Sequence, residues 1–539
     1  MFGLQWGERF SRKSTHPMAD AAGAAQLIRD LPVDNAAAAI GEAAAWLESI
    51  EPENFAPNHR LNLVSMIDEA VIGSVEALTL TYLGAKPGTA GQGADWRILT
   101  EYLDRVSDAY ARIVEASAEL KHAEFAARIP VAIVRSMRSI TLGMKVSWLR
   151  YLPPDRGSWE ALVRCYRDAC ARNAASVTMH AYPTDSEPTS ALQELAVGVM
   201  LGAAAPQGLT PRQVEIAYRA VSTHRKLFTV SIGRDAQPRH YLFDLDNPET
   251  PARVRAEVPP DDSHMFFGGE AVVDEVRPIV AASTGARVAM MPAIAYGDEF
   301  GAGEKLVVLK HLLRFWGPTP PSRRDERRRV NTKIHVEVGA AALRTVLARA
   351  AAGPNAAEPE LDGVLAPKVG AADQGRVTPF NSWTLTDFSS RGIGARFTRR
   401  LDRWLGVGAL VGFRLERSEK WCVGVVRRLR TDSRSQTDVG CEIVAKEACL
   451  VELEGMACTQ TGALWEPAGG SAVRSTAVML PEDTQLATRP SLLFDPATAA
   501  PVRTFIMHKD GTARRIQLGA IAERIDGWDR VEFDYLVAK

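Results

Sequence analysis

The sequence predicts a multidomain α+β protein with an all-α N-terminal domain, a mixed middle segment, an antiparallel β-barrel and a further β-rich C-terminal region. The chain has 539 residues, whereas a single domain typically has about 100 to 200. Hydrophobic residues make up 46% and charged residues 24%, which is typical of a globular protein with several cores. Apolar residues follow a helical period early in the chain and a strand period later.

The helical domain is expected over residues 20–226, after a flexible tail over residues 1–19. Apolar side chains recur there at steps of three and four residues, which predicts roughly seven to nine amphipathic helices. Trp159, Leu162 and Tyr166 have a spacing that resembles the opening of a tetratricopeptide repeat, but no 34-residue period follows. An irregular helical domain with buried aromatic side chains is therefore favoured, and a helical repeat array stays open.

A mixed α/β segment is expected over residues 227–317. Residues 226–232 and 240–245 have the composition of strands, and prolines separate them from their neighbours. The sequence Gly317-Pro-Thr-Pro-Pro321 ends any preceding helix, because proline lacks a backbone donor and restricts the residue before it. This sequence is the predicted boundary to the β-rich part of the chain.

A small antiparallel barrel is predicted over residues 318–455. Apolar and polar residues alternate from Val330 to Val338 and again in three later segments, which is the period of half-buried strands. An Ala-, Gly- and Pro-rich insert at 340–380 is expected to hold one short helix near residues 343–349. The β-rich region at 456–539 contains Asp510-Gly511, a hairpin turn signal.

Composition and motifs argue against several classes of function. The net charge is -1, so no overall field attracts nucleic acid or an anionic membrane. No protease, phosphate-loop, hydrolase or dinucleotide signature occurs, so we expect no enzyme. The ten histidines are scattered and the six cysteines show no C-x-x-C pair, so no metal is expected. Without a secretory signal or an apolar run of about 20 residues, the sequence predicts a cytoplasmic protein with no membrane span.

Two polar motifs are candidates for a binding site. Five arginines occur within seven residues directly before the first predicted barrel strand, namely Arg323, Arg324, Arg327, Arg328 and Arg329. By itself, such a run fits a solvated linker partly neutralised by Asp325 and Glu326. The second motif combines an acid, a hydroxyl and a glycine at the end of a strand: Asp387, Ser389 and Gly392.

The residues of the second motif have complementary properties. Asp387 and Ser389 are two positions apart, so they point to one face of a strand. Gly392 permits a turn with positive φ or a close backbone approach to a ligand. Alone, the motif could equally be a hydrogen-bonded turn.

The two motifs together, R-x-x-x-R and D-x-S-x-x-G on an early barrel strand, resemble the PilZ domain, a family of bacterial cyclic di-GMP receptors. The resemblance covers residues 322–453, about a quarter of the chain, and includes late strands beginning near Trp421 and Val439. Two registers fit the arginine motif: Arg323 with Arg327, and Arg324 with Arg328. The resemblance favours Arg324 and Arg328 supported by Arg323, because family members commonly have paired arginines at the first position, while Arg329 leaves the register open.

One departure from the compact family pattern is the 340–380 insert. It places Asp387 58 positions after Arg329. Insertions in loops cost little free energy, so the barrel itself is still expected.

The resemblance implies cyclic di-GMP as the ligand, with no cofactor. Arginine can bind the guanine O6 and N7 edge or pair with phosphate. Asp387 would accept hydrogen bonds from guanine N1 and N2, and Ser389 would bond a base or a phosphate. The implied function is a receptor that couples ligand binding to a change in domain arrangement and to a protein partner bound by the helical domain. The alternatives are a degenerate PilZ scaffold that binds a protein partner without nucleotide and, less favoured, an arginine patch for nucleic acid.

Overall fold

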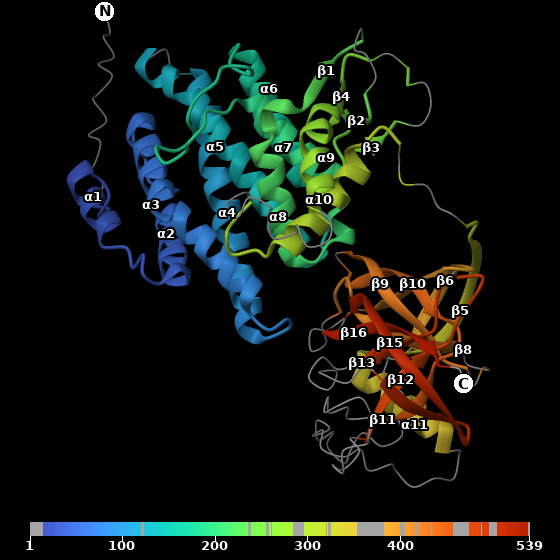
Figure 1. Ribbon diagram of the computed structural model, residues 1–539. Coiled ribbons are helices and arrows are strands. Elements are labelled where there is room, and N and C mark those ends of the chain that lie inside the picture. Colours follow the sequence, from blue (N-terminus) through green and yellow to red (C-terminus); the bar gives the residue numbers. More distant parts are fainter. Residues whose placement is uncertain are drawn as a thin grey trace, which may run out of the picture. The chain divides into compact units, whose positions relative to one another are not determined.

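The computed structural model describes most of the chain (Figure 1). The described residues are 15–119, 123–234, 239–254, 258–259, 261–283, 296–319, 321, 325–352, 382–398, 405–415, 418, 420–432, 434–455, 474–486, 488–494, 504–525 and 527–536. The chain forms two compact units. The first comprises residues 1–206 and 211–321, and the second comprises residues 322–539 with the short segment 207–210.

The first unit begins with the predicted helices. They are α1 (Ala21–Arg29), α2 (Ala36–Ile50), α3 (Pro57–Gly84), α4 (Ala90–Ala116), α5 (Ala123–Trp148), α6 (Arg156–Ala171), α7 (Ala191–Ala203) and α8 (Pro211–Thr223). Several begin at a side chain that accepts a hydrogen bond from a first-turn amide, and these caps are Asp20, Asn35, Thr89, Asp155 and Ser190. The aromatic side chains of α6, Trp159 and Tyr166, are buried, as expected of core residues.

A buried polar network crosses this helical core. The carboxylate of Asp68 on α3 accepts hydrogen bonds from the hydroxyls of Tyr102, Tyr110 and Tyr182 at 2.9 to 3.0 Å. Burial raises the pKa of Asp68. The three phenol donors satisfy the carboxylate oxygens, which makes a fully buried acid tolerable in the core.

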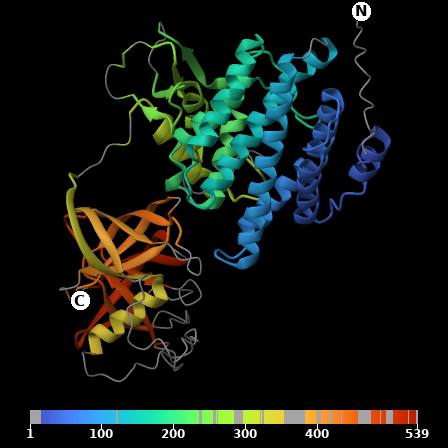
Figure 2. The same cartoon turned by 180° about the vertical axis from the view of Figure 1, so that it is seen from behind.

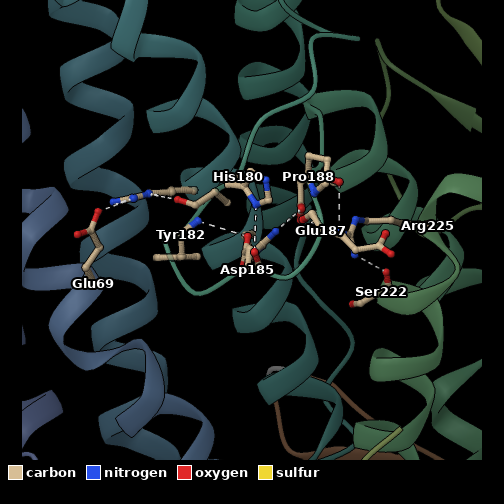
Figure 3. A network of polar contacts seen from close by, with 12 residues as sticks. Glu69, His180, Tyr182, Asp185, Glu187, Pro188, Ser222 and Arg225 are labelled. Atoms are coloured by element: carbon tan, nitrogen blue, oxygen red, sulfur yellow. Dashed lines mark hydrogen bonds and ion pairs between the residues drawn. The ribbon is translucent and has the colours of Figure 1, made fainter. Parts of the chain in front are cut away.

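The face of α5 that carries Arg135, Arg138 and Lys145 pairs with acidic side chains of other segments. Arg135 lies 2.6 Å from Glu69 on α3. Arg138 bridges Asp185 and Glu194, with N–O distances of 2.9 Å to each. Asp185 also accepts a hydrogen bond from the backbone amide of Tyr182 (Figure 3). These contacts fix the segment between α6 and α7 against α5.

The middle segment forms a four-stranded antiparallel sheet and two further helices. The strands β1 (Thr229–Ile232), β2 (Tyr241–Asp244), β3 (Ala252–Arg253) and β4 (His264–Gly268) lie in the order β1-β4-β2-β3, and the helices are α9 (Glu270–Ala282) and α10 (Ala302–Trp316). The two predicted strands are confirmed, although residues 225–227 form a 3-10 turn instead of extending β1. Among the described residues, no helix is both long enough and apolar enough to cross a membrane.

His311 on α10 predicts a pH dependence of stability in this unit. Its Nε2 lies 2.6 Å from the carbonyl oxygen of Ala204, and burial lowers the pKa of His311 to about 4. Between this value and the usual value of about 6.5, the unfolded chain binds a proton that the folded chain does not, so stability falls as the pH falls. We expect a loss of about 2 kcal/mol at pH 5 relative to pH 7.5 from this group.

The measurement is denaturant unfolding at both pH values, followed by circular dichroism, for the wild type and His311→Gln. Glutamine keeps a side-chain donor but does not titrate in this range. The variant should therefore show the smaller dependence on pH. Equal pH dependence in both proteins would show that His311 is not responsible.

The second unit contains two closed six-stranded antiparallel barrels (Figure 1). The first barrel closes in the order β10-β7-β6-β5-β8-β9 and the second in the order β11-β12-β13-β16-β15-β14. The strands of the first are β5 (Arg328–Val338), β6 (Ser382–Ser389), β7 (Gly392–Thr398), β8 (Leu410–Leu415), β9 (Cys422–Thr431) and β10 (Gln436–Ala445). Those of the second are β11 (Cys449–Gly455), β12 (Arg474–Leu480), β13 (Ser491–Phe494), β14 (Thr504–Lys509), β15 (Thr512–Ile525) and β16 (Trp528–Tyr535).

The two barrels share part of their core through helix α11 (Ala340–Ala352). Leu343 and Leu347 of this helix pack in one buried cluster with Val423 of the first barrel and with Val478 and Leu493 of the second. Figure 2 shows α11 beside the strands. The helix lies where one was expected in the 340–380 insert, and residues 353–381 are outside the described part. Strand β11 falls within the range 318–455 expected for the first barrel, but it pairs with β12 and β14 of the second.

Candidate functional site

The candidate site lies on the outer face of the first barrel, where β6 meets β7. Trp383 and Leu385 of β6 are buried, and the Trp383 ring stacks on the Phe397 ring with 4.7 Å between the ring centroids. The alternation of a strand therefore turns Thr384 outward. Leu385 pairs with Ala395 but Asp387 pairs with Gly394, so β6 has one extra residue here, a β-bulge.

Gly394 makes room for the carboxylate of Asp387. A Cβ atom at position 394 would overlap Asp387 Oδ2 and would lie 2.8 Å from Asp387 Cγ. Only a glycine therefore lets Asp387 lie flat against the neighbouring strand. Sequence reasoning did not assign this role to Gly394, because it depends on the pairing of β6 with β7.

Asp387 forms an ion pair with Arg327, which directly precedes β5. The two side chains are 26% and 24% exposed, so the pair is accessible from solvent. Thr386 Oγ1 also lies 3.3 Å from Asp387 Oδ2. A carboxylate has about four acceptor positions, so Asp387 can accept further hydrogen bonds in this arrangement.

The predicted arginines differ from one another in their position relative to Asp387. Arg323 and Arg324 lie outside the described residues. Arg328 is exposed and pairs in register with Phe388, whereas Arg329 pairs with Asp387. Adjacent residues of a strand point to opposite faces, so Arg328 points away from the Asp387 face.

Among the described arginines, the side chain that contacts Asp387 is Arg327, which belongs to the other R-x-x-x-R register. In the sequence, Arg327 was indicated only by the alternative register of the arginine motif, which combines Arg323 with Arg327. The register that binds ligand stays a prediction.

Ser389 and Gly392 lie together at the end of the β6–β7 hairpin. Ser389 Oγ lies 3.4 Å from the carbonyl oxygen of Gly392. The φ of Gly392 is not positive, so the turn expected from this glycine is not of the left-handed kind. Gly392 does permit a close approach, since a Cβ atom there would lie 2.9 Å from the carbonyl oxygen of Cys441 on β10. The glycine therefore allows the protein's own strands to pack.

The linker is tied to the same hairpin by a second contact. Ser390 Oγ donates a hydrogen bond of 2.7 Å to Asp325, and Arg391 Nε lies 3.8 Å from the same carboxylate. Arg391 also donates to the carbonyl oxygen of Gln485 in the second barrel at 3.4 Å. The hairpin turn therefore contacts both the arginine-rich linker and the second barrel.

The charge at the site comes from these arginines and acids. Burial raises the pKa of the Cys441 thiol to about 12, so this group stays neutral beside Arg327. The described residues contain no group of three or more His, Cys, Asp or Glu side chains that could hold a metal ion. The site is therefore a partly exposed arginine–carboxylate surface suited to a ligand with hydrogen-bond donors and negative charge.

The sequence resemblance implies that cyclic di-GMP binds this surface, and Gly394→Ala should then weaken that binding without unfolding the barrel. The new Cβ displaces the Asp387 carboxylate, which is the end of a side chain and can move at little cost. Gly440→Ala is the matched control, since Gly440 pairs with Gly394 and a Cβ there meets only Arg428 atoms at 3.6 Å or more.

We expect roughly tenfold weaker cyclic di-GMP binding for the Gly394 variant in calorimetric titration, corresponding to about 1.4 kcal/mol, and a smaller change for the control. Equal affinities of the Gly394 variant and the wild type would contradict the role of this glycine.

Two family models match the chain. The model described as the N-terminal domain of the cyclic-di-GMP receptor FimW matches residues 21–236, which include helices α1–α8. The model described as the middle PilZ domain of the same receptor matches residues 359–449, which include Asp387, Ser389 and Gly392 but neither β5 nor the arginine run. The comparison with curated proteins gave no match. The C-terminal half of the chain therefore contains a PilZ domain, and the two matched regions are similar to the N-terminal and middle domains of a cyclic-di-GMP receptor.

Proposed function

We propose that this chain binds cyclic di-GMP on the outer face of its first barrel and acts as a receptor, without catalysis of its own. The observation that carries the proposal is the Arg327–Asp387 pair, held over Gly394 beside the arginine-rich linker. Arg323, Arg324, Ser389 and Gly392 complete the proposed site. Arg328, which points away from the Asp387 face, belongs to it only in the Arg324 and Arg328 register.

The chemistry of the ligand matches the chemistry of this surface. Each guanine has donors at N1 and N2, which a carboxylate accepts, and acceptors at O6 and N7, which an arginine fork can bind. Its two phosphates carry negative charge, which pairs with arginine through charge-assisted hydrogen bonds. Asp387 and Arg327 supply one acceptor group and one donor group at the same place.

The proposed output is a change in the arrangement of the two units and in the binding of a protein partner by the helical domain. The linker arginines repel one another, and ligand phosphates would neutralise that repulsion and fix the linker. The hydrogen bond between Ser390 and Asp325 supports this proposal, because it joins the linker to the β6–β7 hairpin, where the ligand is proposed to bind. Identical small-angle scattering profiles with and without saturating ligand would overturn it.

Calorimetric titration of the full chain with cyclic di-GMP, with GTP as the control ligand, tests the binding proposal. A bidentate arginine contact contributes about 1 to 3 kcal/mol, so losing one should weaken binding roughly 5- to 150-fold. Separate titrations of Arg324→Ala, Arg327→Ala and Arg328→Ala distinguish the two registers. No saturable binding by the wild type would leave the barrel as a protein-binding scaffold.

A further inference from the structure

The outer face of the first barrel carries a second arginine–aspartate pair. Arg396 on β7 and Asp438 on β10 are direct partners in the strand register, and Arg396 Nε donates a hydrogen bond of 2.7 Å to Asp438 Oδ1. Their side chains are 55% and 47% exposed. The pair therefore offers the same donor fork and acceptor group as Arg327 and Asp387.

The strand geometry places the two pairs close together on one face. Gly394, which underlies Asp387, and Arg396 are two positions apart on β7, about 7 Å along the strand. Residues two apart on a strand share a face. A ligand that contacts Asp387 therefore needs to extend by only about one base to reach Arg396.

The surface is hollowed beside the second pair. A depression of about 430 Å³ is lined by Arg396, Thr384, Thr386, Thr398 and Gln436, among other residues. Gln436 Nε2 donates a hydrogen bond of 2.8 Å to Thr398 Oγ1, which positions the amide. Hydroxyl and amide groups can both donate and accept, as the polar edge of a purine requires.

We propose that this hollow binds the second guanine of cyclic di-GMP. Its edge would be recognised by Arg396, which lines the hollow, and by Asp438, which lies beside the hollow on the Arg396 side chain. The proposal rests on the proposed function, because the first guanine must occupy the Asp387 site. The two guanines of the ligand are chemically identical, and the barrel presents two arginine–aspartate pairs for them. Arg396 would bind O6 and N7, and Asp438 would accept from N1 and N2.

The test compares cyclic di-GMP with cyclic GMP-AMP, in which an adenine replaces one guanine. The full chain, Arg396→Ala and Asp438→Ala are titrated with both ligands by calorimetry. The wild type should prefer cyclic di-GMP by about tenfold or more, since one guanine contact set is lost with the mixed ligand. In both variants the ratio of the two dissociation constants should fall towards one, because the second base is no longer recognised.

Arg489 and Asp534 supply the matched control. They form an exposed arginine–aspartate pair on the second barrel, with side chains 58% and 68% exposed. Arg489→Ala and Asp534→Ala should keep the wild-type preference and affinity. Thermal unfolding of all variants should match the wild type, because exposed ion pairs contribute little to stability.

Three outcomes would overturn the proposal. In the first, the Arg396 and Asp438 variants keep the wild-type affinity for both ligands. In the second, they lose affinity for both ligands equally, which would indicate contact with the sugar-phosphate ring instead of a base. In the third, the wild type binds neither ligand, which would also remove the proposed function, whereas in the first two cases cyclic di-GMP binding itself remains.

Discussion

The Asp387→Ala variant is expected to bind cyclic di-GMP about 100-fold more weakly than the wild type, or not measurably. The substitution removes the proposed acceptor for guanine N1 and N2 and also the ion-pair partner of Arg327, so two proposed recognition groups are affected. Each good set of base contacts contributes about 1 to 3 kcal/mol, and hundredfold corresponds to about 2.7 kcal/mol. Calorimetric titration of the full chain measures the effect directly.

Asp534→Ala is the control for this experiment. Asp534 is also a strand residue paired with an arginine, but it lies on the second barrel. It should bind cyclic di-GMP as the wild type does. If Asp387→Ala keeps the wild-type dissociation constant, the Asp387 face is not the nucleotide site.

The Glu215→Ala variant is expected to lose about 3 kcal/mol or more of stability in the helical unit. Glu215 on α8 lies 2.8 Å from Lys145 on α5, and both side chains are only 4% exposed. Burial alone would raise the pKa of Glu215, but Lys145 and Arg219 lower it overall, so the carboxylate is charged at neutral pH. Without it, Lys145 is left buried beside the ring of Tyr218, and an uncompensated buried charge is costly.

The loss should appear as a lower denaturant midpoint in circular dichroism, which follows the helices. The exposed pair of Arg156 and Glu160 gives the matched control, and Glu160→Ala should cost about 0.5 kcal/mol or less. Replacing both buried partners in Lys145→Met with Glu215→Leu should restore most of the stability, since an apolar pair leaves no charge unpaired. An unchanged midpoint in Glu215→Ala would show that the pair contributes nothing.

The sequence alone predicted the elements whose pattern is local. The helical period of α4 was visible in residues such as Leu99 and Tyr110, which are buried as expected. The Asp510-Gly511 turn joins β14 to β15 with φ values of 48° and 73°, as a two-residue hairpin with both central residues at positive φ requires. Both signals arise from neighbouring residues, so no knowledge of distant partners was needed.

The tertiary structure decided what depends on pairing between distant strands. The sequence placed the segment of β11 in the first barrel, within 318–455, but its hydrogen bonds to β12 and β14 put it in the second barrel. In the same way, α11 was expected as a short helix, and only the packing of Leu343 and Leu347 shows that it joins the cores of both barrels.

In the candidate site too, local features could be predicted from the sequence, whereas contacts between distant segments could not. Asp387, Ser389 and Gly392 could be identified from sequence because they lie within one hairpin, whose residue spacing fixes their proximity. The contact of Arg327 with Asp387 could not, since it spans 60 positions and depends on the register of β5 against β6. A shift of one residue in a strand turns every side chain to the opposite face, so the sequence determined the candidate residues and the strand register decided which of them meet.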